Sequence, residues 1–140
     1  MNEPTLTHVD EAGAPAMVDV HGKAVSWRLA LAEACVVFPP AAAAALREQG
    51  FSTAKGPVFH TAIIAGTQAA KQTHHLIPFC HALQLERCKV AITMEGDIAV
   101  VRCEAGSHHR TGVEMEALTA VQVALLTIYD MCKAVDRGMV

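Results

Sequence analysis

The sequence has few aromatic residues, little charge and no block of basic residues. Of its 140 residues, 4% are aromatic and 18% are charged, and the formal net charge is −3. Proteins that bind nucleic acid usually carry a basic patch, often with aromatic side chains that stack on bases. The composition therefore argues against a nucleic acid as the partner.

A long apolar run is also missing. The longest apolar stretch, 117–129, is interrupted by Thr and Gln, and it is shorter than the ~20 residues of a membrane span. Residues 1–16 have neither the basic start nor the apolar run of a signal peptide, so we expect them to form a flexible tail. The pattern predicts a soluble protein, away from any membrane, with one domain over 17–140.

Cysteine and histidine do not occur at the spacings that are typical of a disulfide-bonded or a zinc-binding fold. The five cysteines are odd in number and include no C-x-x-C pair, which favours a reducing cytoplasm over a disulfide framework. Histidines such as 74–75 and 108–109 could in principle ligate zinc, but none has the spacing of a zinc ribbon or an H-E-x-x-H helix. We expect no metal site and read these histidines as solvated loop residues.

What the chain does have is apolar surface in excess. Apolar residues make up 52% of the sequence, and the mean hydropathy is +0.29. These values are high for a free-standing monomer with so little charge, so we expect subunit contacts to cover part of the surface.

Residue patterns predict an α+β fold in which helices cover one face of an antiparallel sheet. We expect strands at 17–25, 27–38, 83–94 and 98–105, with a bulge at 86–87, a turn at 95–97 and a polar loop at 106–110. The alanines leave 27–38 ambiguous between strand and helix. Helices are expected from the Pro39-Pro40 pair to a stop at Gly50, at 58–75 and at 111–136.

The last of these helices, 111–136, has an unusual second face. At 100° per residue its first face is a normal apolar stripe. The second face carries Glu116, Asp130 and Lys133 among apolar neighbours such as Met115 and Leu126. Because isolated charges are costly to cover unless they are paired or used, this face predicts a site or a subunit contact.

Several residues could carry chemistry. Asp130 and Lys133 are neighbours at i, i+3 and could exchange protons with a substrate, although the same spacing describes an ordinary surface ion pair. Cys80-His81 could be a metal fragment, a nucleophile, an anion-binding corner or plain structure. Basic residues such as Lys55 and Arg28 suit a phosphate but are surface residues by default.

Glu116 precedes Asp130 by fourteen helical residues, which corresponds to about 21 Å along the axis. The two carboxylates of one subunit therefore cannot both contact the same small part of a ligand.

Six segments together resemble a known family. They are MVDV at 17–20, KG at 55–56, AG-x-QAAK at 65–71, LIPFCH at 76–81, TGVEMEALTA at 111–120 and TIYDMCKAV at 127–135. In this order they are similar to the cyclic pyranopterin monophosphate synthases, the accessory protein C of molybdenum-cofactor biosynthesis. The resemblance extends over nearly all of 17–140.

The resemblance implies a lyase that converts cyclised dihydroguanosine triphosphate to cyclic pyranopterin monophosphate and diphosphate, without a metal or organic cofactor. It further implies a ferredoxin-like α+β fold and a homohexamer, a trimer of dimers, with sites where subunits meet. Asp130 matches the family's catalytic acid, Lys133 its catalytic lysine and Lys55 the lysine of the K-G loop. The residues that match substrate-lining segments are Arg28, Phe79, Cys80, His81, Met115 and Glu116.

The chain also departs from the family pattern. Pro57 replaces an aspartate after the K-G pair, Ile63 an arginine, His75 an acidic residue and Ala82 a proline. The family continues beyond the M-V of 139–140 into a Gly-rich tail that supplies a further lysine. These departures leave a second hypothesis open, a paralogue with little activity that binds nucleotide or a partner enzyme only.

Overall fold

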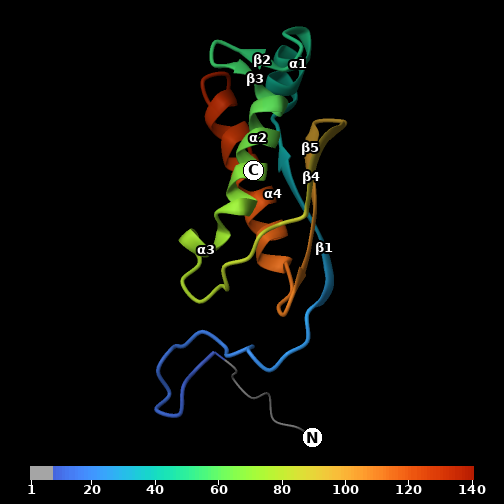
Figure 1. Cartoon of the computed structure of the whole chain (residues 1–140). Coiled ribbons are helices and arrows are strands. Elements are labelled where there is room, and N and C mark those ends of the chain that lie inside the picture. Colours follow the sequence, from blue (N-terminus) through green and yellow to red (C-terminus); the bar gives the residue numbers. More distant parts are fainter. Residues whose placement is uncertain (1–7) are drawn as a thin grey trace, which may run out of the picture.

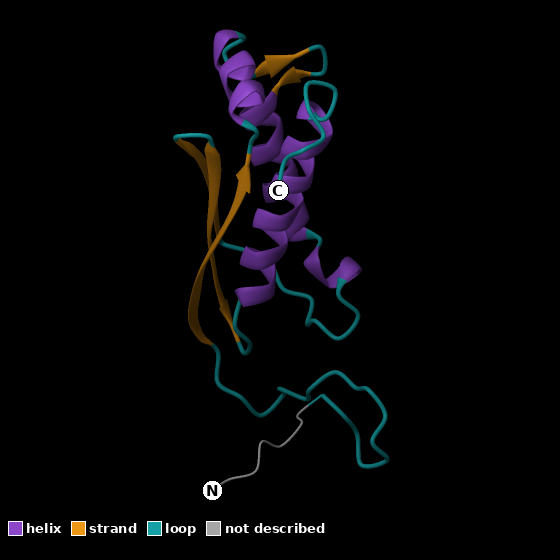
Figure 2. Cartoon of the chain, turned by 180° about the vertical axis from the view of Figure 1, so that it is seen from behind, coloured by secondary structure: helices purple, strands orange, loops and turns teal. Residues whose placement is uncertain are grey.

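The computed structural model describes residues 8–140, which form a three-stranded antiparallel sheet with helices on one face (Figure 1). The sheet consists of β1 (Ser26–Val37), β4 (Arg87–Glu95) and β5 (Ile98–His109). The helices are α1 (Pro40–Glu48), α2 (Val58–Lys71), α3 (Thr73–Leu76) and α4 (Glu114–Cys132). A small hairpin, β2 (Ser52–Thr53) and β3 (Gly56–Pro57), connects α1 to α2. Figure 2 shows the sheet and the helices as two separate layers.

The strand order is β1-β5-β4, so the longest pairing joins distant parts of the chain. β1 pairs with β5 from Ser26↔His109 to Val37↔Ile98. β4 and β5 form a hairpin whose turn contains Gly96 at φ 62°, a conformation that favours glycine. The predicted α+β class, with helices on one face of an antiparallel sheet, is confirmed, and the arrangement is consistent with a ferredoxin-like fold.

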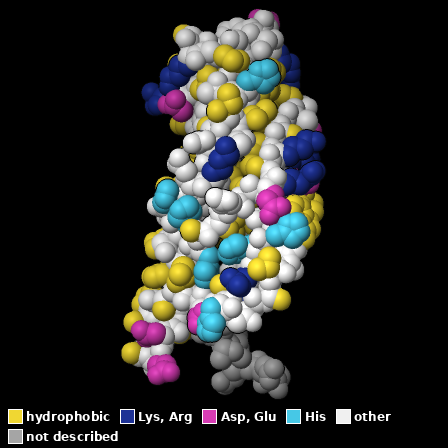
Figure 3. Space-filling view, in the orientation of Figure 1, with side chains coloured by type: hydrophobic (Ala, Val, Ile, Leu, Met, Phe, Trp, Pro, Cys, Tyr) yellow, Lys and Arg dark blue, Asp and Glu magenta, His cyan; other side chains and the backbone are white. Residues whose placement is uncertain are grey.

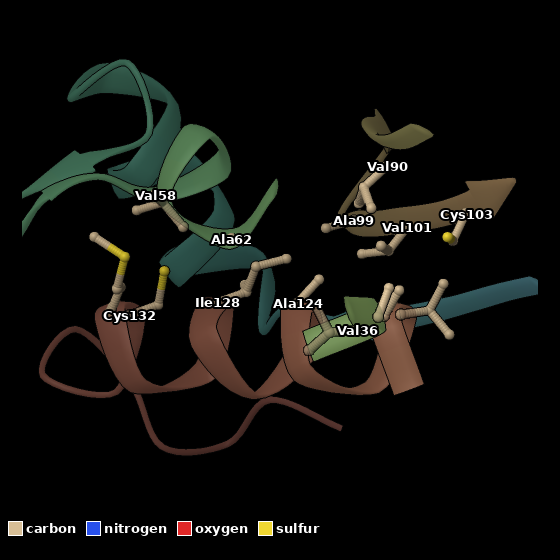
Figure 4. Close-up of a cluster of buried hydrophobic side chains, with 14 of the residues drawn as sticks. Val36, Val58, Ala62, Val90, Ala99, Val101, Cys103, Ala124, Ile128 and Cys132 are labelled. Atoms are coloured by element: carbon tan, nitrogen blue, oxygen red, sulfur yellow. The ribbon is translucent and has the colours of Figure 1, made fainter. Parts of the chain in front are cut away.

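α4 lies in the core, where it packs against α2 and against β1 and β5 of the sheet (Figure 4). Its inward residues are fully buried, as the helical periodicity predicts; they include Ala117, Ala120, Val121, Ala124 and Ile128. α2 approaches it closely at Gly66, where a Cβ atom would lie 2.8 Å from the carbonyl oxygen of Ala120. The small residues on both helices thus allow their backbones to come together.

Three predictions are wrong in the first and middle parts of the chain: the existence of one strand, the start of another and the end of a helix. Residues 17–25 form no strand, because no neighbouring segment offers them a ladder of hydrogen bonds. The 83–94 strand begins only at Arg87, and 83–86 is irregular rather than bulged. The helix predicted for 58–75 stops at Lys71 and resumes as the short α3. Thr73 donates its hydroxyl to the carbonyls of Ala69 and Ala70 at this break.

One further difference concerns the residues that precede α4. The polar segment 106–110 was expected to be a loop, yet β5 continues to His109 because β1 supplies partners there. Tertiary pairing overrides local composition in this strand. α4 begins and ends within the predicted range, at Glu114 and Cys132.

Within the part of the chain that the structure describes, α4 is the one helix long and apolar enough to cross a membrane by length and composition. Half of it is buried against the sheet and α2. The core helix of a water-soluble protein passes the same test.

Candidate active site

At the end of α4, a carboxylate lies between two lysines. The Nζ atom of Lys55 donates to Oδ2 of Asp130 at 2.6 Å, and Nζ of Lys133 lies 2.9 Å from Oδ1. Lys55 also reaches the carbonyl oxygen of Asp130, at 3.2 Å. Lys55 comes from the β2–β3 hairpin and precedes Gly56, whose φ of 113° favours glycine. The three residues are called the lysine–aspartate cluster below.

The charge state of this cluster follows from its hydrogen bonds. The ammonium of Lys55, and secondly that of Lys133, lower the pKa of Asp130 to about 2. Asp130 is therefore ionised at neutral pH, with a proton donor on each of its oxygens. Its side chain is 53% exposed, and exposed ion pairs contribute little to stability. The arrangement is suited to binding and proton transfer more than to holding the fold together.

The six substrate-lining residues expected from the sequence all lie around one cavity, of about 600 Å³. They come from three elements: Arg28 from β1; Phe79, Cys80 and His81 from the loop after α3; and Met115 and Glu116 from the first turn of α4. Segments far apart in the sequence therefore converge here. This cavity is called the pocket below.

Glu116, on the second face of α4, is buried. Only 3% of the residue is exposed, and the thiol of Cys80 lies 3.8 Å from its Oε1. Burial raises the pKa of Glu116 above its usual range. Burial, together with the nearby Glu116, also raises the pKa of Cys80. Cys80 is thus held as a neutral thiol, which disfavours the nucleophile among the alternatives for the Cys80-His81 pair.

The pocket is also lined by cationic side chains. Arg28 donates through Nη2 to the carbonyl of Arg110 at 3.4 Å, and Lys23 lines the same cavity. The Nε of Arg28 is buried without a hydrogen-bond partner among the described residues. Buried donors are normally paired, so these side chains are suited to an anionic ligand. Sequence reasoning missed Lys23 and Arg110, although Arg110 directly precedes the TGVEMEALTA segment.

The structure thus places the candidate residues in two groups at opposite ends of α4. Asp130 and Lys133 occupy the C-terminal end, whereas Met115 and Glu116 occupy the first turn. The helix rise separates Glu116 from Asp130 by about 21 Å. Within a single chain, the two groups of residues cannot both contact the same atoms of a small ligand.

Metal ligands do not gather in the part of the chain that is described. Over residues 8–140, no three side chains of His, Cys, Asp or Glu are arranged to hold a metal ion. On the face shown in Figure 3, histidines are scattered from near the top to the lower part of the molecule. Several histidines have hydrogen-bond partners of their own; for example, His108 contacts Glu86, and His109 contacts Thr111.

An ionised aspartate between lysines, with a separate pocket walled by arginines and a lysine, is typical of acid–base enzymes that act on small anionic substrates. The chain belongs to the MoaC family, whose sequence model matches residues 17–140.

Similar proteins carry a common name. A protein of Xanthomonas oryzae pv. oryzae is 55% identical over 135 residues, which cover 96% of this chain and 82% of that protein. Proteins of Xanthomonas axonopodis pv. citri and Xanthomonas campestris pv. campestris are 56% and 53% identical over the same shares. All three are named cyclic pyranopterin monophosphate synthase.

We expect Glu116→Gln to stabilise the fold at neutral pH. A carboxyl whose pKa is raised by folding binds its proton more tightly in the folded state, so stability falls as pH rises from the unfolded pKa to the folded one. Glutamine stays neutral and keeps an acceptor for Cys80. Urea unfolding between about pH 4 and pH 8 should show that the variant loses this decline, while Glu114→Gln, at an exposed neighbour, keeps it. If the free energy of unfolding of Glu116→Gln fell as steeply with pH as that of the wild type, or more steeply, Glu116 would not be the group with the raised pKa.

Proposed function

We propose that this chain is a cyclic pyranopterin monophosphate synthase, a lyase that converts cyclised dihydroguanosine triphosphate to cyclic pyranopterin monophosphate and diphosphate. The lysine–aspartate cluster carries the proposal, because Lys55 of the β2–β3 hairpin meets Asp130 and Lys133, at the end of α4, at hydrogen-bonding distance. The identity of 53–56% to proteins of that name supports the same reaction.

The cluster suggests a division of roles. With its pKa near 2, Asp130 is a base in the resting protein, and it becomes an acid only after it has taken a proton from the substrate. The ammonium groups of Lys55 and Lys133 can donate protons and stabilise charge on the departing diphosphate. We assign the pocket, with Arg28, His81 and Glu116, to substrate binding. No step of this scheme calls for a metal or an organic cofactor.

Turnover of the cyclised nucleotide tests the proposal. The purified protein should release diphosphate and yield a product that becomes a fluorescent pterin after oxidation. A folded protein that binds the nucleotide without either product would instead support the second hypothesis, the paralogue with little activity. A folded protein that neither binds nor converts the nucleotide would overturn both.

Two of the departures bear on that second hypothesis. Ile63 stands where an arginine is usual and packs against the hydrophobic core, so it cannot replace the lost charge. Pro57 is the residue that precedes α2, and it removes a carboxylate beside Lys55. The chain thus lacks one acidic and one basic side chain of the family pattern, and this loss is the specific observation that favours a binding-only protein.

We also propose a homohexamer, assembled as a trimer of dimers, in the cytoplasm. The five cysteines are all unpaired, as a reducing compartment requires. On the outer face of the sheet, β1 exposes a row of large apolar side chains: Trp27, Leu29, Leu31 and Val37. A row of this kind marks a contact surface. Arg102 pairs with Glu33 and Glu95 beside it, so the face carries both signs of charge and could pack against a second copy.

The assembly is tested at Leu31, which is 75% exposed. Light scattering should give wild-type particles of six subunits, and Leu31→Asp should give smaller ones because it places a charge in the apolar row. Ala44→Asp, on the exposed side of α1, is the control and should leave the mass unchanged. A wild-type monomer, or an unchanged mass for Leu31→Asp, would contradict this interface.

A further inference from the structure

One wall of the pocket is an irregular segment, 18–23, called the strap below. Val18, Val20 and Lys23 of the strap line the cavity together with the first turn of α4. The strap belongs to no strand or helix, and its one internal backbone hydrogen bond closes a turn between Lys23 and Val20. Its position therefore depends on contacts with the rest of the chain.

Two hydrogen bonds supply those contacts among the described residues. The Nε2 atom of His81 lies 2.6 Å from the carbonyl oxygen of Val18, so the ring donates at one end of the strap. At the other end, Nε of Arg110 donates to the carbonyl of Lys23 at 3.0 Å. The two donors come from different walls, namely the loop after α3 and the segment after β5. Together they hold the strap against the cavity at both ends.

Arg110 also connects the strap to β1. Its carbonyl accepts the bond from Nη2 of Arg28, while its side chain holds Lys23. Three cationic side chains, those of Lys23, Arg28 and Arg110, thus line the same pocket, and like charges repel one another. The Nε of Arg28 is buried there without a partner among the described residues. A chain of phosphates between these side chains would relieve the repulsion and supply the missing acceptor.

We propose that Arg110 is a positioning residue that fixes the strap over the pocket and so builds a polyphosphate-binding wall from Lys23 and Arg28. The role of this wall in turnover rests on the proposed function, since the triphosphate arm of the substrate is the ligand it would hold. Arg110 acts through the backbone of Lys23 rather than through the reacting atoms. Its loss should weaken substrate binding and leave the chemical step intact.

Kinetics of Arg110→Ala test this role. Without the Nε donor, we expect the KM for the cyclised nucleotide to rise about tenfold or more, as for the loss of a charged hydrogen bond, while kcat stays within about twofold. Arg110→Lys keeps a cationic donor and should restore part of the binding. Arg87→Ala is the matched control: Arg87 pairs with Glu104, outside the pocket, and its KM should be that of the wild type.

A second measurement is independent of turnover. Hydrogen-exchange mass spectrometry of residues 17–25 should show faster exchange in Arg110→Ala than in the wild type, because the strap is released. Inorganic tripolyphosphate should slow this exchange in the wild type and bind more weakly to Arg110→Ala.

These readouts separate the inference from the proposed function. A wild-type protein without turnover would overturn the synthase, yet exchange and tripolyphosphate binding would still decide the role of Arg110. Unchanged exchange and unchanged tripolyphosphate binding in Arg110→Ala would overturn the inference, as would a fall in kcat at constant KM in an active protein.

Discussion

Asp130→Asn is expected to lower turnover of the cyclised nucleotide by about 10³-fold, within the range for loss of a general acid or base. The amide cannot accept a proton from the substrate, and it removes the charge that holds the ammonium groups of Lys55 and Lys133 in place. Diphosphate release under saturating substrate measures the effect.

The fold should survive this substitution, because the side chain is half exposed and outside the core. Asp97→Asn is the control, since Asp97 is another partly exposed aspartate in an ion pair, with Arg47. That variant should keep wild-type activity. More than a tenth of wild-type activity in Asp130→Asn would remove the residue from the catalytic group.

The low pKa of Asp130 also limits how kcat/KM can depend on pH. Because the two lysines depress it to about 2, the carboxylate stays ionised throughout the mildly acidic range. Any fall of kcat/KM in that range must therefore come from another group. Glu116, whose pKa burial raises, is one such group in the pocket, and Glu116→Gln would test it by shifting the acidic limb.

The parts of the fold that follow from local pattern could be predicted, and the parts that depend on distant partners could not. The apolar stripe of 111–136 correctly placed a helix against the core, and proline followed by alanines correctly placed α1. The polar residues at 106–109 gave no sign that β1 would pair with them. In the same way, 17–25 has strand-like residues but meets no strand in the structure.

The candidate site shows the same division. The i, i+3 spacing placed Lys133 next to Asp130, but no spacing rule predicts that Lys55, far away in sequence, reaches the same carboxylate at 2.6 Å. The resemblance to the family indicated that residue instead. Glu116 was expected to lie on a partly polar helix face, whereas the loop that carries Cys80 contacts it and contributes to its burial. Lys23 and Arg110 were missed because their roles depend on backbone contacts of an irregular segment.

The separation of the lysine–aspartate cluster from the pocket has a consequence for assembly. If one complete site needs both groups, and α4 keeps them about 21 Å apart in one chain, each site must combine the cluster of one subunit with the pocket of another. In a symmetric dimer the same contact occurs twice, so each pair of subunits holds two shared sites.

Two inactive variants should therefore restore activity when they assemble together. Asp130→Asn damages only the cluster, and Arg28→Ala damages only the pocket. In a mixed dimer, one shared site carries both defects and the other carries none. Random pairing makes half of the dimers mixed, so co-expression of the two variants, each with a different affinity tag, should recover about a quarter of wild-type activity.

The control pairs two variants from the same group, Asp130→Asn with Lys133→Ala. Every site in that mixture keeps a damaged cluster, so no activity should return. Recovery in the first mixture and not in the second would establish sites shared between subunits, because only the first leaves one site intact. Absence of recovery in mixed particles isolated through both tags would show that each chain completes its own site, and that the two ends of α4 act on separate ligands or separate steps.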